Sequence, residues 1–306
     1  MPQPEAFMCC SFSMPRFEDI EPMVDIFGAM RRNGTIPNCV WMTSLIETLC
    51  ISGRREDFWK GEGPIPDWRA DELQEQMGVG HWLARWGLYG SRRIVQAQFD
   101  QIQEVVQKAA PTGTLTGHMY TGQTEGGLVD AASVPLEHGA MLVGVPSLWS
   151  LPLIDWPLPR NSKGKAAHGD YAPVIPSSGK AVLEWMQVSK PIYQAAGIEL
   201  MGDFFMHERH VLLMNMFTYD QQDPVQRQRV HELYLALHEE SKKRGYGMYR
   251  AHVNHMDLIA DLNDFNNHAY NRLVEKIKDA IDPNGILAPG KQGIWPNRFR
   301  HLRDKV

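Results

Sequence analysis

The sequence predicts an α+β fold in which helices flank an antiparallel sheet. Two observations support this class. The order strand, helix, strand occurs twice within the first 120 residues, which indicates a duplicated α+β pattern. At 306 residues with 43% apolar content, the chain is also long enough to bury a sizeable core. The repetition is one of pattern, because no aligned sequence repeat accompanies it.

The elements of the first part follow from hydrophobic periodicity. Strands are expected over 7–13, 81–89 and 114–119, and amphipathic helices over 17–32 and 92–109. Asn33-Gly34 is a helix-ending signal for the first of these helices. Between the cycles, residues 38–50 are expected to be mostly buried, and the polar residues 54–69 to form a surface excursion.

The second part begins after a Pro-, Ser- and Gly-rich loop at 146–165, in which Trp149 and Trp156 are expected as buried anchors. The further elements expected are strands over 169–175, 199–206 and 210–217, and helices over 179–195, 224–244 and 265–281. Asp282-Pro283 ends the last helix, because proline cannot continue it. The chain then finishes as a tail rich in turn residues.

Composition narrows the classes of function. A net charge of -5 with scattered basic residues argues against a nucleic-acid or membrane-surface binder. No apolar run approaches transmembrane length, and the N-terminus lacks the features of a secretion signal. The four cysteines form no CxxC pair, so free thiols in a reducing compartment are expected. We therefore expect a cytoplasmic protein.

Three groups of residues are candidates for a catalytic or metal-binding site. The pairs His207/His210 and His252/His255 have the close spacing of metal ligands, but no carboxylate or thiol stands at a convincing spacing beside them, so no metal site is predicted. A nucleophile triad is not indicated, because the GxSxG elbow is missing. The third is Tyr249-Arg250, whose phenol hydroxyl and guanidinium can together hold an oxyanion. Taken alone, such a pair is more often a surface ion-pair arrangement.

The C-terminal stretch AIDPNGILAPGKQGIWP, with MYRAHVNHMD about thirty residues before it, resembles the end of the vanillyl-alcohol oxidase and 4-cresol methylhydroxylase family, which includes eugenol oxidase. The opening strand and helix ending RNGTIPN resemble the start of the family's substrate-binding cap domain. The resemblance implies a duplicated ferredoxin-like cap over 1–250, followed by a helical C-terminal segment over 251–306. Members of this family use FAD to oxidise para-substituted phenols.

The resemblance also assigns roles to four residues. Tyr249 and Arg250 match the pair that binds the phenolate oxygen, and His168, in AAHGDYAPVIPSSG, matches the histidine that is linked covalently to the flavin. Asp203 matches a position that faces the reacting carbon and can activate water. Physical chemistry agrees, because a free phenol has a pKa near about 10 and an adjacent arginine can lower it by about 1–3 units. The phenolate loses hydride more readily than the phenol.

Family members carry an N-terminal FAD-binding domain with a Gly-rich phosphate-binding loop, and this sequence contains no such loop. We therefore expect a fragment, a truncated gene product or one subunit of a split enzyme, with an FAD domain as partner and a phenol as substrate. The final segment would pack on that domain, where Ile286, Leu287, Ile294 and Trp295 would find a partner surface. The resemblance is also compatible with a homodimer. Two alternatives remain: an inactive remnant or binding module that keeps the cap fold, and an unrelated metal- or hydrolase-type activity.

Overall fold

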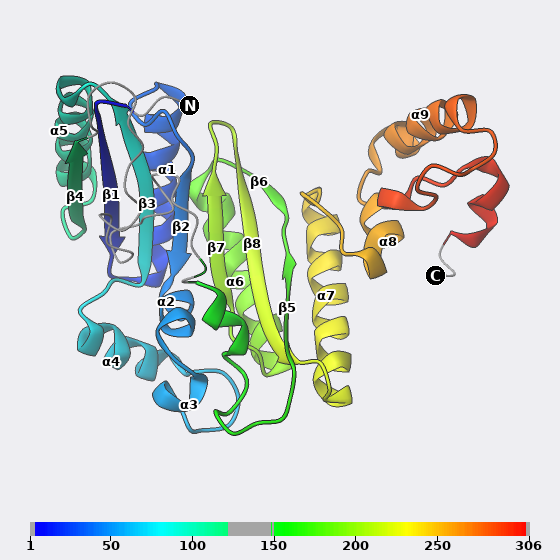
Figure 1. Ribbon diagram of the computed structural model, residues 1–306, viewed down its shortest axis with the longest axis horizontal. Coiled ribbons are helices and arrows are strands. Elements are labelled where there is room, and N and C mark those ends of the chain that lie inside the picture. Colours follow the sequence, from blue (N-terminus) through cyan, green and yellow to red (C-terminus); the bar gives the residue numbers. More distant parts are fainter. Residues whose placement is uncertain (1–3, 122–147, 149, 304–306) are drawn as a thin grey trace.

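The molecule is built around one antiparallel sheet with the strand order β4-β1-β3-β2-β7-β8-β5, and β6 pairs with β8 (Figure 1). The computed structural model describes residues 4–121, 148 and 150–303. The strands are β1 (Ala6–Met14), β2 (Val40–Ser44), β3 (Trp82–Gly90), β4 (Thr114–Thr121), β5 (Ala166–Tyr171), β6 (Val174–Pro176), β7 (Met201–Met206) and β8 (His210–Asp220). The helices are α1 (Ile20–Arg32), α2 (Leu45–Ser52), α3 (Arg55–Phe58), α4 (Asp67–Met77), α5 (Arg92–Ala109), α6 (Gly179–Ala196), α7 (Pro224–Arg244), α8 (Met256–Ala260) and α9 (Phe265–Ile281).

The sheet consists of two ferredoxin-like units joined edge to edge. The first contains β1, α1, β2, β3, α5 and β4, and its strands lie in the order β4-β1-β3-β2. The second contains β5, α6, β7, β8 and α7, and pairing of β2 with β7 joins it to the first. The two strand–helix–strand cycles of the first 120 residues therefore make up a single ferredoxin-like unit. The duplication is of this whole unit, which the second part of the sheet repeats. The predicted antiparallel α+β fold is confirmed.

A short backbone pairing takes the place of a fourth strand in the second unit. After α7 the chain returns beside β5, where Met248 forms a bridge with Pro173. The Tyr249 amide donates to the Ala172 carbonyl at 2.9 Å, and the Val174 amide donates to the Gly247 carbonyl at 2.8 Å. This pairing fixes the backbone of Tyr249 at the edge of the sheet.

Most predicted element boundaries agree with the structure, and the differences have local causes. The single strand expected over 169–175 is two strands, β5 and β6, separated by Ala172 and Pro173. Proline has no amide to donate to a strand ladder, so the pairing breaks there. The segments expected as a buried stretch and a surface excursion contain β2, α2, α3 and the start of α4. Trp156 is a buried anchor as predicted, whereas Trp149 lies outside the described residues.

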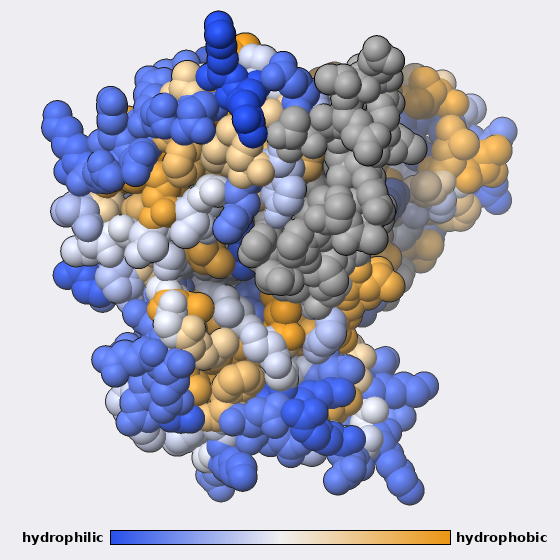
Figure 2. Space-filling model, turned by 60° about the vertical axis from the view of Figure 1, so that its left-hand side comes forward, coloured by the Kyte–Doolittle hydropathy of each residue, from blue (hydrophilic) through white to orange (hydrophobic). Residues whose placement is uncertain are grey.

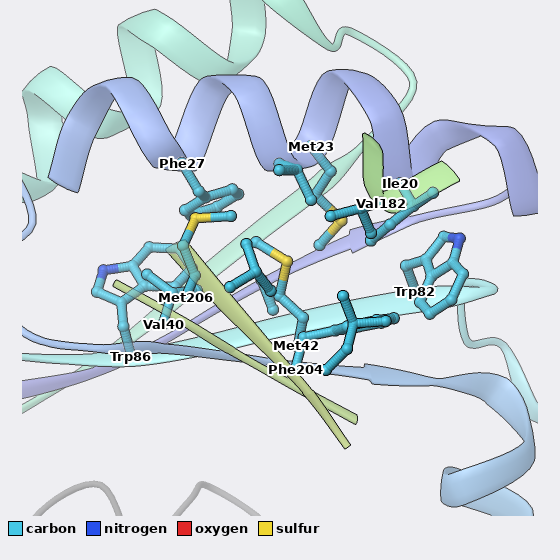
Figure 3. Close-up of a cluster of buried hydrophobic side chains, with 14 of the residues drawn as sticks. Ile20, Met23, Phe27, Val40, Met42, Trp82, Trp86, Val182, Phe204 and Met206 are labelled. Carbon is cyan, nitrogen blue, oxygen red and sulfur yellow. The ribbon is translucent and has the colours of Figure 1, made fainter. Parts of the chain in front are cut away.

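The core lies between one face of the sheet and the helices α5, α1, α6 and α7 (Figure 1). Alternate strand residues point into it, among them Met42 of β2 and Phe204 of β7 (Figure 3). Their chain neighbours Thr43 and Asp203 are paired in register and therefore point to the opposite face. That second face is covered in part by α2 and by the turn around Trp156, and it carries the polar residues considered below.

The C-terminal segment follows α7 and lies beside it (Figure 1). Part of its apolar surface is covered by the chain itself: Trp295 is 8% exposed, and its indole nitrogen donates to Asp257 at 2.7 Å. In contrast, Ile286 is 78% exposed and Leu287 is 55% exposed. The expectation that all of these apolar residues require a surface outside the chain is therefore wrong for Trp295.

The structure also bears on the expectations about the cysteines and about membrane-spanning segments. All four cysteines are free thiols. Within residues 4–121 and 150–303, none of the helices combines the length and the apolar character needed to cross a bilayer.

Candidate functional site

The main candidate site is a pocket of about 670 Å³ at the edge of the second unit. It lies between β5, the first turns of α7 and the chain at 250–255. The side chains that line it are mostly basic or aromatic: His168, Asp170, Phe217, Tyr219, Arg227, His231, Tyr234, Arg250, His252 and His255. Two guanidinium groups and four imidazoles face one carboxylate, so this donor set favours an anionic ligand with a flat ring.

Arg250 enters this pocket directly after the edge pairing that holds Tyr249. Its Nη2 lies 3.5 Å from Oδ1 of Asp170, and the arginine side chain is 61% exposed. The guanidinium carbon also lies 5.8 Å from the centre of the Tyr249 ring. An ion pair this exposed is worth little in water. The guanidinium therefore keeps most of its capacity to bind a second anion.

His168 lies on β5, opposite Thr218 of β8, and its imidazole is exposed. Asp170 follows two residues later in the same strand, so both side chains leave the same face. The structure thus brings His168 and Arg250 to one pocket, with Asp170 between them. Sequence reasoning missed Asp170, although it lies two residues after His168, at the start of the strand predicted over 169–175.

The other two predicted residues stand apart from the pocket lining. Tyr249 is 55% exposed and does not line the pocket, although it neighbours Arg250. Asp203 lies on β7, separated from β5 by β8 alone, and is only 5% exposed. Adjacent strands are about 4.8 Å apart, and the β8 partners of Asp203 and Asp170 lie two residues apart along the strand, so the backbones of the two acids are about 12 Å apart and their side chains share one face of the sheet. That span is of the order of one substituted phenol.

Asp203 has an unusual electrostatic environment. Burial raises the pKa of its carboxyl to about 7, while a hydrogen bond from the Trp41 indole and the nearby Arg85 guanidinium oppose that rise. The Arg85 guanidinium lies 4.7 Å from the centre of the Trp41 ring. A carboxyl with a pKa near 7 can exchange a proton at neutral pH, as general acid–base chemistry requires.

Stacked histidines form the wall of the pocket opposite β5. The His255 ring lies 3.9 Å from the Tyr234 ring, measured between centres, and 5.7 Å from His231. Burial, followed by the neighbouring His231 and His252, lowers the pKa of His255 to about 4.

His207 and His210 also stack, with 4.7 Å between their ring centres. Within the described residues, no group of three histidine, cysteine or acidic side chains is arranged to hold a metal ion.

The His255 environment predicts a loss of stability in acid. The folded-state pKa lies below the ordinary value of 6.5, so this residue supports the folded state above pH 6.5 and withdraws that support as pH falls toward 4. His255→Phe keeps a ring on Tyr234 but cannot titrate. In urea unfolding at pH 7.5 and pH 5, we expect this variant to lose less stability than the parent. The exposed His301→Phe is the control, and equal pH dependence in all three proteins would contradict the prediction.

Comparison with known proteins identifies flavoproteins that are similar to this chain. Residues 192–292 match the family described as FAD linked oxidases, C-terminal domain. The 4-cresol dehydrogenase (hydroxylating) flavoprotein subunit of Pseudomonas putida is 26% identical over 296 residues, which cover 96% of this chain and 53% of that protein.

Solved structures agree with these sequence matches. The 4-ethylphenol oxidase from Gulosibacter chungangensis, in complex with isoeugenol, is similar over 98% of this chain and 56% of its own, with 26% identity and a TM-score of 0.85. Substrate-bound p-cresol methylhydroxylase is similar over 96% of this chain and 54% of its own, with 26% identity and a TM-score of 0.80. The chain thus spans about half the length of the relatives that it matches.

Proposed function

Because the chain is a homologue of the C-terminal portion of FAD-linked phenol-oxidising flavoproteins, as its sequence predicted, we propose that it forms the substrate-binding half of such an enzyme. The reaction is the oxidation of a para-substituted phenol of the vanillyl alcohol, eugenol or cresol type, by hydride transfer through a quinone methide. The observation that carries this proposal is that His168 and Arg250, which are 82 positions apart in the sequence, line one pocket.

The chemistry of the pocket fits a flavin at its edge. The exposed imidazole of His168 is a nucleophile available for covalent attachment to the flavin ring, and the basic and aromatic lining suits a flat, electron-rich ligand. FAD, once bound, supplies the acceptor for the hydride. The phosphate-binding part of the cofactor site would come from the partner FAD domain, because the sequence here has no Gly-rich loop.

The roles of the chain's own residues follow from their charges. Arg250, with Tyr249 beside it, would hold the substrate as its phenolate and lower the pKa of the bound phenol by about 1–3 units. Asp203, which lies two strands away from Asp170, the ion-pair partner of Arg250, would face the para substituent. Its carboxylate would take the proton of a water that attacks the quinone methide, since its pKa near 7 allows it to be ionised at neutral pH.

We also propose that residues 251–306 contact the FAD domain. This segment exposes apolar side chains along α9 and the following loop, which form an apolar stripe of Phe265, Tyr270, Leu273, Ile277, Ile281, Ile286 and Leu287. Hydrophobic residues are visible in this region at the upper right of Figure 2. Exposed apolar side chains of this kind are typical of a protein interface. A flavin-binding domain is the partner that we propose, because the similar protein of Pseudomonas putida is a flavoprotein subunit of which this chain covers 53%.

The experiment is complementation with a flavin-binding domain. The chain should be co-expressed with the FAD-binding part of the Pseudomonas putida relative and purified as a complex. We expect a yellow complex whose flavin remains with the protein after acid precipitation. His168→Asn should release the flavin into the acid supernatant, whereas His231→Asn, in the same pocket, should not. Release from the parent complex would contradict attachment at His168, and a colourless product that binds no phenol would contradict the proposed function.

A further inference from the structure

A second carboxyl group lies near Asp203 and takes no part in the function proposed above. Helix α2 begins immediately after β2 and packs on the sheet face that carries Asp203. From this helix, Glu47 is buried to 1% exposure. Its Oε2 has no hydrogen-bond partner among the described residues. An ionised carboxylate that is buried with one oxygen unpaired would be costly, so the position favours the protonated form of Glu47.

The surroundings of Asp203 offer the hydrogen-bond donor that Oε2 of Glu47 lacks. The Asp203 carboxylate accepts a hydrogen bond from the Trp41 indole. The Arg85 guanidinium lies against Trp41, at 4.7 Å from the ring centre, and its Nη2 is 3.4 Å from Oγ1 of Thr43, the register partner of Asp203. Donors and a nearby cation stabilise a carboxylate. The two acids therefore occupy environments that suit different protonation states.

We propose that Glu47 retains a proton at neutral pH and thereby keeps Asp203 as the single ionised carboxylate of the pair, balanced by Arg85. Glu47 is then a positioning residue, which acts on the substrate only through Asp203. Its catalytic consequence depends on the proposed function, whereas the proton distribution does not. Two ionised carboxylates in this space would face one cation, so a neutral partner is what allows Asp203 to stay charged.

The neighbouring groups affect the pKa values of both carboxyls. Burial, and then the charge of Asp203, raises the pKa of Glu47 well above its ordinary range, and Arg85 only partly opposes this. For Asp203, burial is the largest cause of its raised pKa, Asp170 of β5 adds to it, and Trp41 and Arg85 reduce it. Hydrogen-bond donors oppose the rise in pKa for Asp203, whereas for Glu47 only the charge of Arg85 opposes it.

The pair then gives a defined proton acceptor for the proposed hydroxylation. The water oxygen forms a bond to the electrophilic carbon of the quinone methide, and its proton passes to the Asp203 carboxylate. The electron pair of the exocyclic double bond moves through the ring to the phenolate oxygen at Arg250. Glu47 is unchanged by the step, and the charge of the carboxyl pair goes from minus one to zero. No further oxidant is needed, because the hydride has already left.

The test is a carboxyl titration of the purified chain by ¹³C NMR, with Asp and Glu side chains labelled. We expect Glu47→Gln to leave the Asp203 midpoint within about half a pH unit of its parent value, because glutamine imitates a neutral glutamate. Asp203→Asn should lower the Glu47 midpoint by about one unit or more, because it removes the neighbouring negative charge. A role for Glu47 in packing alone predicts no such asymmetry.

Two results would overturn the proposal. A fall of about one unit or more in the Asp203 midpoint in Glu47→Gln would place the proton on Asp203, and unchanged midpoints in both variants would show that the carboxyls are not coupled. If Glu47→Gln fails to fold, the titration of Glu47 in Asp203→Asn still decides between coupled and independent groups. The measurement needs no flavin domain, so its outcome is separate from that of the complementation experiment.

Discussion

Replacing Arg250 by alanine is expected to weaken the binding of para-substituted phenols by about 10- to 100-fold. A hydrogen bond to a charged group contributes about 1.5–3 kcal/mol, and each 1.4 kcal/mol changes affinity tenfold. The guanidinium is 61% exposed and its ion pair with Asp170 is long, at 3.5 Å, so the native fold depends little on it. Titration calorimetry with 4-ethylphenol, on the complemented complex and on the isolated chain, measures the effect.

Two variants separate the predicted role from a general loss of positive charge. Arg227 lines the same pocket, but its Nη1 donates to the Gln221 carbonyl at 2.9 Å, so Arg227→Ala should change phenol affinity by less than about threefold. Arg250→Lys keeps the charge and loses the planar pair of donors, so it should fall between the parent and Arg250→Ala. Equal losses in Arg227→Ala and Arg250→Ala would exclude a specific phenolate clamp.

Replacing Phe204 by alanine is expected to lower the free energy of unfolding by about 3–5 kcal/mol, the range for a fully buried aromatic residue. Phe204 is completely buried and lies 5.3 Å from the Trp82 ring, measured between centres, in the core between the sheet and the helices (Figure 3). Removal of the ring takes away its contacts and leaves a cavity that the close-packed neighbours cannot fill. Urea unfolding followed by tryptophan fluorescence measures the loss.

The neighbouring Phe205 is a matched control for this prediction. It has the same chemistry and the same strand, but it points to the opposite sheet face, where it is half-buried and stacks on Trp41 at 6.3 Å. Phe205→Ala should therefore cost only about 1–2 kcal/mol. If Phe205→Ala proves as destabilising as Phe204→Ala, the assignment of the two faces is incorrect.

The sequence by itself determined the local elements and the proteins that the chain resembles. Periodic apolar residues located α5 and α9 with the bounds that the structure has, because an amphipathic pattern of three or more turns has few alternative interpretations. The motif around Tyr249 and Arg250 pointed to the phenol-oxidising flavoproteins, since it is long and specific. The division of the chain at residue 250 and the roles of the four site residues remain predictions.

Only the tertiary structure decided which side chains meet. The sequence could not reveal that Asp170 pairs with Arg250, or that Glu47 is buried near Asp203, because these contacts depend on strand register and on the placement of α2 over one face of the sheet. The sequence likewise could not show which surface buries Trp295. An apolar side chain indicates that it will be buried, but it does not indicate against which surface. The hydrophobic effect does not specify which surfaces meet. Strand register and helix packing specify this, and they therefore place the residues of the site.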